Sequence, residues 1–252
     1  MAGDAVLVLG ATGPSGICVV RELLHRNHRT IAYVRSPDKI PDDLKSNPLL
    51  EITTGDIESP LLPQTLARTN PSTIISLLGP TPSALLTTLT SPFGPPLPYP
   101  AHYADHILPA MRDHGVARIL ALCTISYAAP DDESNWTRAG FRGLVRVVMP
   151  AAYRAMVGIA GVFKGEVGGL LEGVDWVLMR VPGLVGGAEE MEWRVDREVG
   201  GVYAGVVGRE WTANVKRGRL ARWCVDWVEG AVTVGEGEGG RGRMPAVSAA
   251  RG

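Results

Sequence analysis

The stretch GATGPSG at residues 10–16 decides the fold of this chain, because the sequence pattern predicts a strand before it and a helix after it. An apolar run of strand length occupies residues 5–9, and residues 17–25 place their apolar side chains three or four positions apart, as in an amphipathic helix. A second apolar run of strand length follows at residues 30–34. The pattern predicts a β-α-β unit whose first turn is rich in glycine.

The glycines of this turn have the spacing that the diphosphate of a dinucleotide requires. Gly10 permits the tight turn, Gly13 lets the backbone approach the diphosphate without a Cβ in the way, and Gly16 allows close contact between helix and strand. The free N–H groups and the positive dipole end of the helix then hold the phosphate charge. The turn also has two hydroxyl side chains and one residue without an N–H group, which are Thr12, Ser15 and Pro14. We predict a dinucleotide-binding site; the alternative is a tight turn beside an empty site.

The end of the second predicted strand indicates which dinucleotide is bound. NAD sites usually carry an acidic residue there for the ribose 2′-hydroxyl, whereas a 2′-phosphate requires a cation. The chain has YVRS at residues 33–36, and the first carboxylate follows only at Asp38. Arg35 can form paired hydrogen bonds with a phosphate, and Ser36 can donate its hydroxyl. NADP(H) is therefore favoured over NAD, with a solvated arginine at a strand end as the alternative.

Two later strand ends add weaker signals in the expected order. Asp56 and Ile57 follow a predicted strand at residues 49–53, where the carboxylate suits the adenine edge and the apolar side chain suits its ring. Leu78 and Gly79 end a predicted strand at residues 73–78, where a small residue lets the nicotinamide ribose approach.

The rest of the chain continues the alternation of strands and helices. Near-continuous apolar strands separated by helices indicate a parallel sheet covered on both faces. Further helices are predicted at 60–68, 101–114 and within 211–229, and further strands at 118–123 and 176–180. We therefore predict an α/β fold with a doubly wound, Rossmann-like parallel sheet, forming a single domain over residues 1–233.

Two segments differ in composition from this domain. Residues 91–100 contain five prolines, so we expect neither helix nor central strand there, and we place them at the rim of the site. Residues 234–252 are rich in Gly, Glu and Arg, and we expect this tail to be disordered.

Composition and charge exclude several classes of protein. Lys and Arg number 25 against 26 Asp and Glu, which disfavours a nucleic-acid partner. Three scattered cysteines indicate neither a disulfide framework nor a zinc site, and His102 and His106 lack the neighbouring glutamate of a zinc protease, so no metal is expected. Asp4 and the absence of a basic start disfavour a signal peptide, and the apolar stretch 144–163 contains two arginines and Pro150. We interpret that stretch as a buried or subunit-facing helix of a cytoplasmic protein without a membrane partner.

The sequence resembles the atypical short-chain dehydrogenase/reductases, in the NAD(P)-binding group that includes NmrA-like proteins and biliverdin-IXβ and flavin reductases. The resemblance rests on motifs spread over most of the chain, which are GATGPSG (10–16), VR (34–35), GD (55–56), LLG (77–79), HGV (114–116) and WVLMRVP (176–182). It implies a Rossmann-like fold and an NAD(P) cofactor, with Pro182 among the residues beside it. Residues 119–185 also resemble fungal NAD(P)-binding proteins, some of them oxidoreductases of secondary metabolism.

The catalytic pair typical of short-chain dehydrogenases, a tyrosine four residues before a lysine, is absent. The residues four positions after Tyr103, Tyr127 and Tyr153 are Ile107, Asp131 and Val157. Ser126 and Tyr127 follow the fifth predicted strand, at the sheet edge where substrates bind in open α/β folds, and they are catalytic candidates. Similarity to isoflavone-reductase-like proteins, whose active-site lysine lies at a similar distance before the sixth strand, adds Lys164. For Tyr153, a packed helix face is favoured over catalysis.

Three functions are compatible with these residues. The favoured hypothesis is an NADPH-dependent oxidoreductase that reduces a small apolar or aromatic substrate, in a pocket beneath residues 91–100 and beside residues 181–187. Biliverdin and flavin reductases need no strong acid of their own, which is compatible with the missing pair. The alternatives are a non-catalytic NADP(H)-sensing regulator and a redox-neutral isomerase or cyclase. We expect a monomer or homodimer whose partner is a small-molecule substrate.

Overall fold

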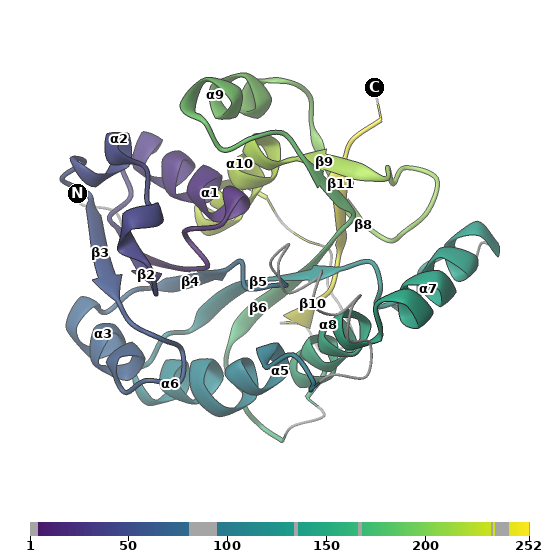
Figure 1. The fold of residues 1–252 in the computed structure, drawn as a ribbon, viewed down its shortest axis with the longest axis horizontal. Helices are drawn as coiled ribbons and strands as arrows, with labels where there is room; N and C mark the ends of the chain where they lie inside the picture. The colour runs from purple at the N-terminus through teal and green to yellow at the C-terminus, as the bar shows by residue number, and fades with distance from the viewer. Residues whose placement is uncertain are drawn as a thin grey trace.

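A central, mostly parallel sheet lies between two layers of helices (Figure 1). The computed structural model describes residues 5–80, 95–133, 136–165, 168–232, 234 and 242–251, apart from the side chains of residues 136–138, 141 and 142. The strands of the sheet are β1 (Val6–Leu9), β2 (Thr30–Val34), β3 (Leu50–Thr54), β4 (Thr73–Ser76), β5 (Arg118–Thr124), β6 (Asp175–Val181), β8 (Val202–Gly205), β10 (Gly242–Arg243) and β11 (Ala246–Ala249).

The order of the strands reverses between β1 and β4. The sheet runs β3-β2-β1-β4-β5-β6-β11-β8, so the chain winds outward in one direction up to β3 and in the other direction from β4. β1 is parallel to β2 on one side and to β4 on the other. Ligands of open α/β sheets bind outside the carboxyl ends of the strands at such a reversal. The predicted doubly wound α/β fold is confirmed.

Helices cover both faces of this sheet (Figure 1). One layer contains α1 (Pro14–His25), α9 (Glu190–Glu198) and α10 (Arg217–Val228). The opposite layer contains α3 (Leu61–Thr69), α5 (Tyr99–Ala101), a π-helical turn η2 (His102–Ile107), α6 (Leu108–Asp113) and α8 (Pro150–Phe163). Short turns of helix, η1 (Pro37–Lys39) and α2 (Asp42–Lys45), follow β2.

The residues of β1 show why the strands are continuously apolar. Val6 and Val8 pack in the same core as α1 and α10, whereas Leu7 and Leu9 pack in the other core with α3, α6 and α8. All four side chains are fully buried. A strand between two helical layers has no solvent-facing side, so alternation of polar and apolar residues disappears.

The helix expected at residues 101–114 is present but irregular. It begins at Tyr99, two residues earlier than expected, and the turn from His102 to Ile107 is wider than an α-helix. Pro109 is the second residue after this turn. A proline lacks the N–H group and clashes with the carbonyl four residues earlier, and a π-helical turn relieves that clash. Of the proline-rich segment, residues 91–94 lie outside the described part of the chain.

The apolar stretch 144–163 forms two helices rather than one. α7 (Trp136–Val148) ends one residue before Met149, and α8 begins at Pro150, because proline fits the first turn of a helix but not its interior. α8 is buried as expected, whereas Leu144, Val147 and Val148 at the end of α7 are 59%, 77% and 43% exposed. Of the two expected alternatives, burial holds for α8 but not for the end of α7, where a subunit-facing helix stays a prediction. Within the described residues, none of the helices has the length and apolar character needed to cross a bilayer.

The chain beyond α10 corrects the prediction of a disordered tail at 234–252. β11 lies between β6 and β8, parallel to the former and antiparallel to the latter, and Ala246 and Val247 are fully buried. The short apolar run AVSA is enough for a strand, but the glycine-rich composition around it concealed this signal. Residues 235–241 and 252 lie outside the described part of the chain. A separate pair of strands, β7 (Gly183–Val185) and β9 (Asn214–Lys216), extends beyond the carboxyl end of β6.

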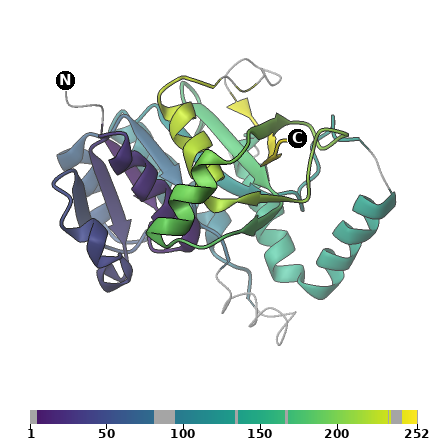
Figure 2. The same ribbon diagram turned by 90° about the horizontal axis from the view of Figure 1, so that it is seen from above.

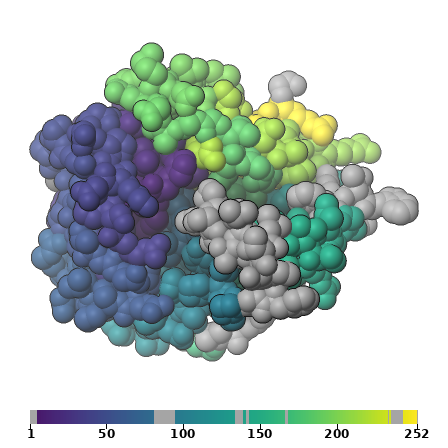
Figure 3. Space-filling view, viewed as in Figure 1, coloured from purple at the N-terminus to yellow at the C-terminus, as the bar shows by residue number. Residues whose placement is uncertain are grey.

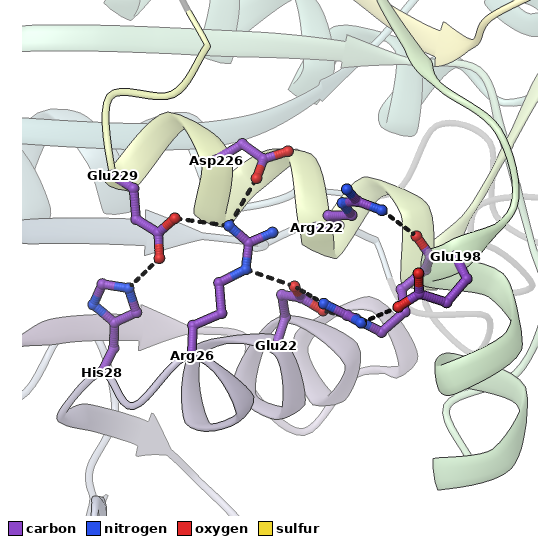
Figure 4. A network of polar contacts seen from close by, with 8 residues as sticks. Glu22, Arg26, His28, Glu198, Arg222, Asp226 and Glu229 are labelled. Carbon is purple, nitrogen blue, oxygen red and sulfur yellow. Dashed lines mark hydrogen bonds and ion pairs between the residues drawn. The ribbon is translucent and has the colours of Figure 1, made fainter.

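A buried carboxylate joins the three helices of the α1 layer (Figure 4). Glu22 of α1 has a fully buried side chain and accepts hydrogen bonds from Arg197 of α9 at 2.8 and 3.0 Å and from Arg26 at 2.8 Å. Arg26 also forms ion pairs with Asp226 and Glu229 at the end of α10, at 2.7 and 2.8 Å. Burial alone would raise the pKa of Glu22, but the hydrogen bonds and charges of the two arginines outweigh burial and lower it.

Replacing Glu22 should therefore destabilise the protein in a pH-dependent way. We expect Glu22→Gln to lower the free energy of unfolding by about 3 kcal/mol at pH 7, because two arginines lose a shared buried partner. The lowered pKa means that this contribution is present above the unfolded-state pKa and is lost as pH falls through the folded-state pKa. Denaturant titrations of both proteins from pH 7 to pH 3 measure it.

The matched control is Glu190→Gln, which removes a carboxylate from the exposed Glu190–Arg194 pair. It should change the free energy of unfolding by less than about 0.5 kcal/mol at any pH. Equal effects of the two substitutions at pH 7 would contradict a structural role for the buried carboxylate.

Candidate functional site

The turn between β1 and α1 lies against the end of β4. Gly10 has a φ of +77°, and a Cβ at this position would lie 2.9 Å from the carbonyl oxygen of Leu77. Leu77 in turn donates its N–H to the carbonyl of Leu9 at 2.9 Å. A side chain at residue 10 would therefore strain the backbone and separate β1 from β4. The role predicted for this glycine, a tight turn, agrees with the geometry.

The other two glycines of the turn differ in what surrounds them. A Cβ at Gly16 would lie 2.2 Å from the carbonyl oxygen of Gly10, so the close contact of helix and turn depends on its absence. A Cβ at Gly13 would meet just one atom within 4 Å, the same oxygen at 3.5 Å. The backbone at Gly13 is thus open on its outer side, as the close approach of a ligand requires.

The first turn of α1 suits an anion. Helical hydrogen bonding begins with the N–H of Ile17, which donates to the carbonyl of Gly13 at 2.9 Å, so the N–H groups of Ser15 and Gly16 precede it. The first turn contains no acidic residue, and Pro14 occupies the position where a missing N–H costs least. The half-buried hydroxyl residues Thr12 and Ser15 flank this turn. The arrangement fits the diphosphate of a dinucleotide.

The cation predicted for a 2′-phosphate lies at the end of β2. Arg35 is exposed, and no carboxylate forms an ion pair with it among the residues that the structure describes. Burial raises the pKa of the nearby Tyr99 phenol, and the positive charge of Arg35 partly opposes this rise. Ser36 is half-buried and precedes η1. The arginine is therefore accessible to an anionic ligand at this strand end.

The residues after β3 are arranged differently from expectation. Asp56 is exposed, and its carboxylate accepts the N–H of Glu58 at 3.3 Å. Ile57 is 8% exposed and packs in the core with Leu62 and Leu66, so little of its side chain is accessible to an adenine ring. Leu78 and Gly79, after β4, are half-buried and line a cavity at this edge of the sheet.

A cavity of about 780 Å³ opens at the carboxyl ends of β4, β5 and β6. Its walls come from the segments after these strands, from α7 and α8, and from the chain before β9. The residues that line it are Leu78, Gly79, Pro80, Leu122, Thr124, Ile125, Ser126, Asp132, Val145, Met149, Ala152, Tyr153, Met156, Val181, Pro182, Gly183, Leu184, Val207, Trp211 and Ala213. Small-molecule sites have this size, and the walls are predominantly apolar, as such sites usually are.

Among the described lining residues, the one ionised side chain, Asp132, is paired with an arginine. Asp132 binds Arg180 of β6 through two hydrogen bonds of 2.5 and 2.9 Å, and both side chains are buried. Asp132 also accepts the N–H groups of Ala129 and Val207, at 2.9 and 3.0 Å. Burial alone would raise the pKa of Asp132, but the hydrogen bonds from Arg180 and these N–H groups outweigh it and lower the pKa.

Arg180 also connects the cavity to the C-terminal strands. Its Nε donates to the carbonyl of Met244 at 2.7 Å, and its Nη1 donates to the carbonyl of Tyr127 at 3.3 Å. Three segments therefore meet at one buried ion pair. They are the segment after β5 with Tyr127 and Asp132, the segment before β9 with Val207, and the C-terminal segment with Met244. Sequence reasoning did not identify this pair, because its members lie 48 residues apart with no motif around Asp132.

The structure brings some of the predicted catalytic residues to the cavity and not others. Of the predicted catalytic residues, Ser126 lines it. Pro182, which was predicted beside the cofactor, also lines it. Lys164 lies exposed at the end of α8, with its Nζ 5.9 Å from the centre of the Tyr127 ring. Neither Lys164 nor Tyr127 is among the lining residues, and Tyr127 packs against the core below. The predicted roles of these two residues have no support from the cavity geometry.

Tyr153 is a polar lining residue that was not among the predicted catalytic residues. A packed helix face was favoured for it, and the structure places it half-buried with its helix against the cavity. The sequence feature that could have located Tyr153 is Pro150, which marks the start of α8. A residue in the first turn of this helix lies near the carboxyl ends of β5 and β6, where the cavity opens.

Comparisons with known proteins agree with this geometry. Residues 10–229 match the sequence profile of a family described as NAD(P)H-binding. No curated protein sequence matches the chain. Among solved structures, a short-chain dehydrogenase/reductase of wide type from Veillonella parvula in complex with NADP is similar over 97% of this chain and 94% of that chain, with 13% identity and a TM-score of 0.68.

Two further solved structures share the fold. The oxidoreductase ylbE from Lactococcus lactis aligns over 98% of this chain and 91% of its own, with 14% identity and a TM-score of 0.64. ChuY, an anaerobilin reductase from Escherichia coli O157:H7, aligns over 97% of both chains, with 13% identity and a TM-score of 0.61. At these identities the likeness is one of fold. The family match spans the glycine turn, the cavity and α10, and the chain belongs to the NAD(P)H-binding family.

Proposed function

We propose that this protein is an NADPH-dependent oxidoreductase that reduces a small, apolar or aromatic substrate such as a quinone, flavin or ketone. The observation that carries the proposal is the position of the cavity. It opens at Leu78, Gly79 and Pro80, directly after β4, and the glycine turn lies against the end of the same strand. A dinucleotide held by that turn and a substrate held in the cavity would therefore meet at one sheet edge.

The residues present fit the cofactor. The open backbone at Gly13 and the first turn of α1 would hold the diphosphate, and Arg35 with Ser36 would hold a 2′-phosphate. When bound, the reduced nicotinamide supplies a hydride, and the protein supplies binding, orientation and exclusion of water.

The polar groups of the cavity have positions suited to a carbonyl substrate. Ser126 and Tyr153 line it from the segment after β5 and from α8, and each has a hydroxyl that can donate to a substrate oxygen. Reduction of a carbonyl adds a hydride to carbon and a proton to oxygen. We propose Tyr153 as the group that delivers the proton and Ser126 as the group that orients the oxygen.

The charge of the cavity narrows the substrate class. No Lys, Arg or His is among the lining residues of the described chain, and the carboxylate that lines it is already engaged by Arg180. Residues 81–94, which follow the Pro80 wall, contain no ionisable side chain in the sequence. An anionic substrate would gain no cation from the described side chains of the wall, which supports a neutral substrate.

Cofactor preference tests the role assigned to Arg35. Arg35→Ala should raise the Kd for NADPH about 10-fold to 100-fold and leave the Kd for NADH unchanged, because it removes charged hydrogen bonds to the 2′-phosphate. Calorimetric titrations with both coenzymes measure this change. Arg68→Ala, at another exposed arginine, is the matched control. Equal affinity of the unmodified protein for NADH and NADPH would contradict the assignment.

Turnover tests the roles assigned to the cavity hydroxyls. With 9,10-phenanthrenequinone as acceptor, Tyr153→Phe should lower kcat about 100-fold while NADPH binding is retained, since proton transfer is lost but the cavity is not. Ser126→Ala should lower kcat less. Oxidation of NADPH followed by absorbance measures both.

Lys164→Ala discriminates the cavity hydroxyls from the lysine suggested by family resemblance. Its exposed position outside the cavity predicts turnover close to that of the unmodified protein. Loss of turnover in this variant with full activity in Tyr153→Phe would reverse the assignment. Tight NADPH binding without oxidation by any quinone, flavin or ketone would instead favour the non-catalytic regulator.

Substrate charge gives an independent test of the cavity. We expect 1,4-naphthoquinone to be reduced with a kcat/KM at least about 10-fold higher than its 2-sulfonate, because the sulfonate meets no cation among the described side chains of the wall. Leu184→Arg, which places a cation on the cavity wall, should lower the ratio of the two kcat/KM values toward one. A ratio near one in the unmodified protein would show that the neutral walls do not select the substrate.

A further inference from the structure

The end of α7 presents apolar side chains to solvent. Leu144, Val147 and Val148 are 59%, 77% and 43% exposed, and helical spacing places the three residues on one side of the helix. α7 lies at the edge of the molecule, beyond α8 (Figure 2). In the space-filling view, its teal surface forms part of the margin of the molecule (Figure 3). This face is without a covering element among the described residues.

The charge of the same segment is strongly one-sided. Residues 136–165 contain five cationic residues and no aspartate or glutamate, although the whole chain has a net charge of −1. Arg138, Arg142 and Arg146 recur every four residues along α7, so their positions share the side of the helix opposite Leu144. A helix with an apolar face, a basic face and no acidic residue is typical of segments that lie in the surface of an anionic bilayer.

The inner side of this helix belongs to the substrate cavity. Val145 of α7 and Met149, which separates α7 from α8, both line it. A surface that α7 contacts would therefore lie beside the cavity wall. Apolar molecules such as quinones partition into bilayers, so this neighbourhood would bring the cavity close to their source.

We propose that α7 is the contact through which this protein binds the surface of an anionic lipid bilayer. This proposal departs from the expectation that the protein has no membrane partner, and the contact it describes is peripheral and non-spanning. The apolar face would enter the headgroup boundary, and the positive charge of α7 would attract the helix to the anionic surface.

The charges disfavour the other occupants of this face. A second copy placed face to face would bring the three arginines of one α7 near the three of the other, with no carboxylate in residues 136–165 to pair with them. A nucleic acid would match the cations but would leave the exposed Leu144, Val147 and Val148 without an apolar partner. The proposal does not depend on the reductase activity, since membrane contact requires neither cofactor nor substrate.

Co-sedimentation of the full chain with lipid vesicles tests this proposal. The protein should sediment with vesicles of phosphatidylcholine and phosphatidylglycerol and remain in solution with phosphatidylcholine alone. Raising NaCl from about 0.05 to 0.5 M should release it, because screening weakens the attraction. Leu144→Gln/Val147→Gln should lower the partition coefficient at least about 10-fold, and Arg146→Gln about fivefold.

The matched control is Met191→Gln/Val195→Gln, which removes apolar residues of α9 that are 72% and 56% exposed. It should sediment like the unmodified protein, and NADPH binding should be unchanged in every variant. Failure of the unmodified protein to sediment with anionic vesicles would overturn the proposal. So would equal loss in the α9 variant, or a dimer in light scattering that Leu144→Gln/Val147→Gln converts to monomers.

Discussion

The close contact between the first turn of α1 and the end of β1 is the constraint on which the rest of the structure depends. The helix can start where it does because Gly16 has no Cβ to meet the carbonyl of Gly10, 2.2 Å from where that atom would lie. This contact directs the N-terminus of α1 toward the reversal of strand order between β1 and β4. The positive end of the helix, the open backbone at Gly13 and the cavity after β4 are then neighbours because the same turn positions them.

The features that sequence predicts well are those set by short stretches of chain. The glycine turn has a fixed spacing, and the strands buried between two helical layers are continuous apolar runs, so the order from β1 to β6 follows from local pattern. β11 was not predicted, because its four small residues lie next to a glycine-rich stretch and show almost no hydrophobic periodicity. Their place in the sheet depends on pairing with β6 and β8. The exposure of the end of α7 was not predicted either, since hydropathy does not distinguish a covered apolar face from an uncovered one.

The same distinction applies to the candidate site. Arg35 and the residues of the glycine turn are identified by their position after a strand, which sequence can show. The cavity is assembled from segments that meet only in the folded protein, and the pair Arg180–Asp132 holds three of them together. Lys164 was suggested by its distance along the chain from β6, but a distance in sequence does not determine which side of α8 a residue occupies. Tyr153 lies in the first turn of that helix, against the cavity.

Calorimetric titration of NADPH into the folded protein and its Gly13→Glu variant tests the central claim most directly. A Cβ at residue 13 has room, at 3.5 Å from its nearest neighbour, so the variant should fold normally while placing a carboxylate where the diphosphate would bind. Gly168→Glu, at a position with open space around it, provides the control for added charge. The account predicts saturable binding to the unmodified protein and the control, and none to Gly13→Glu. Binding of NADPH to Gly13→Glu with unchanged affinity, or no binding to the unmodified protein, would contradict it.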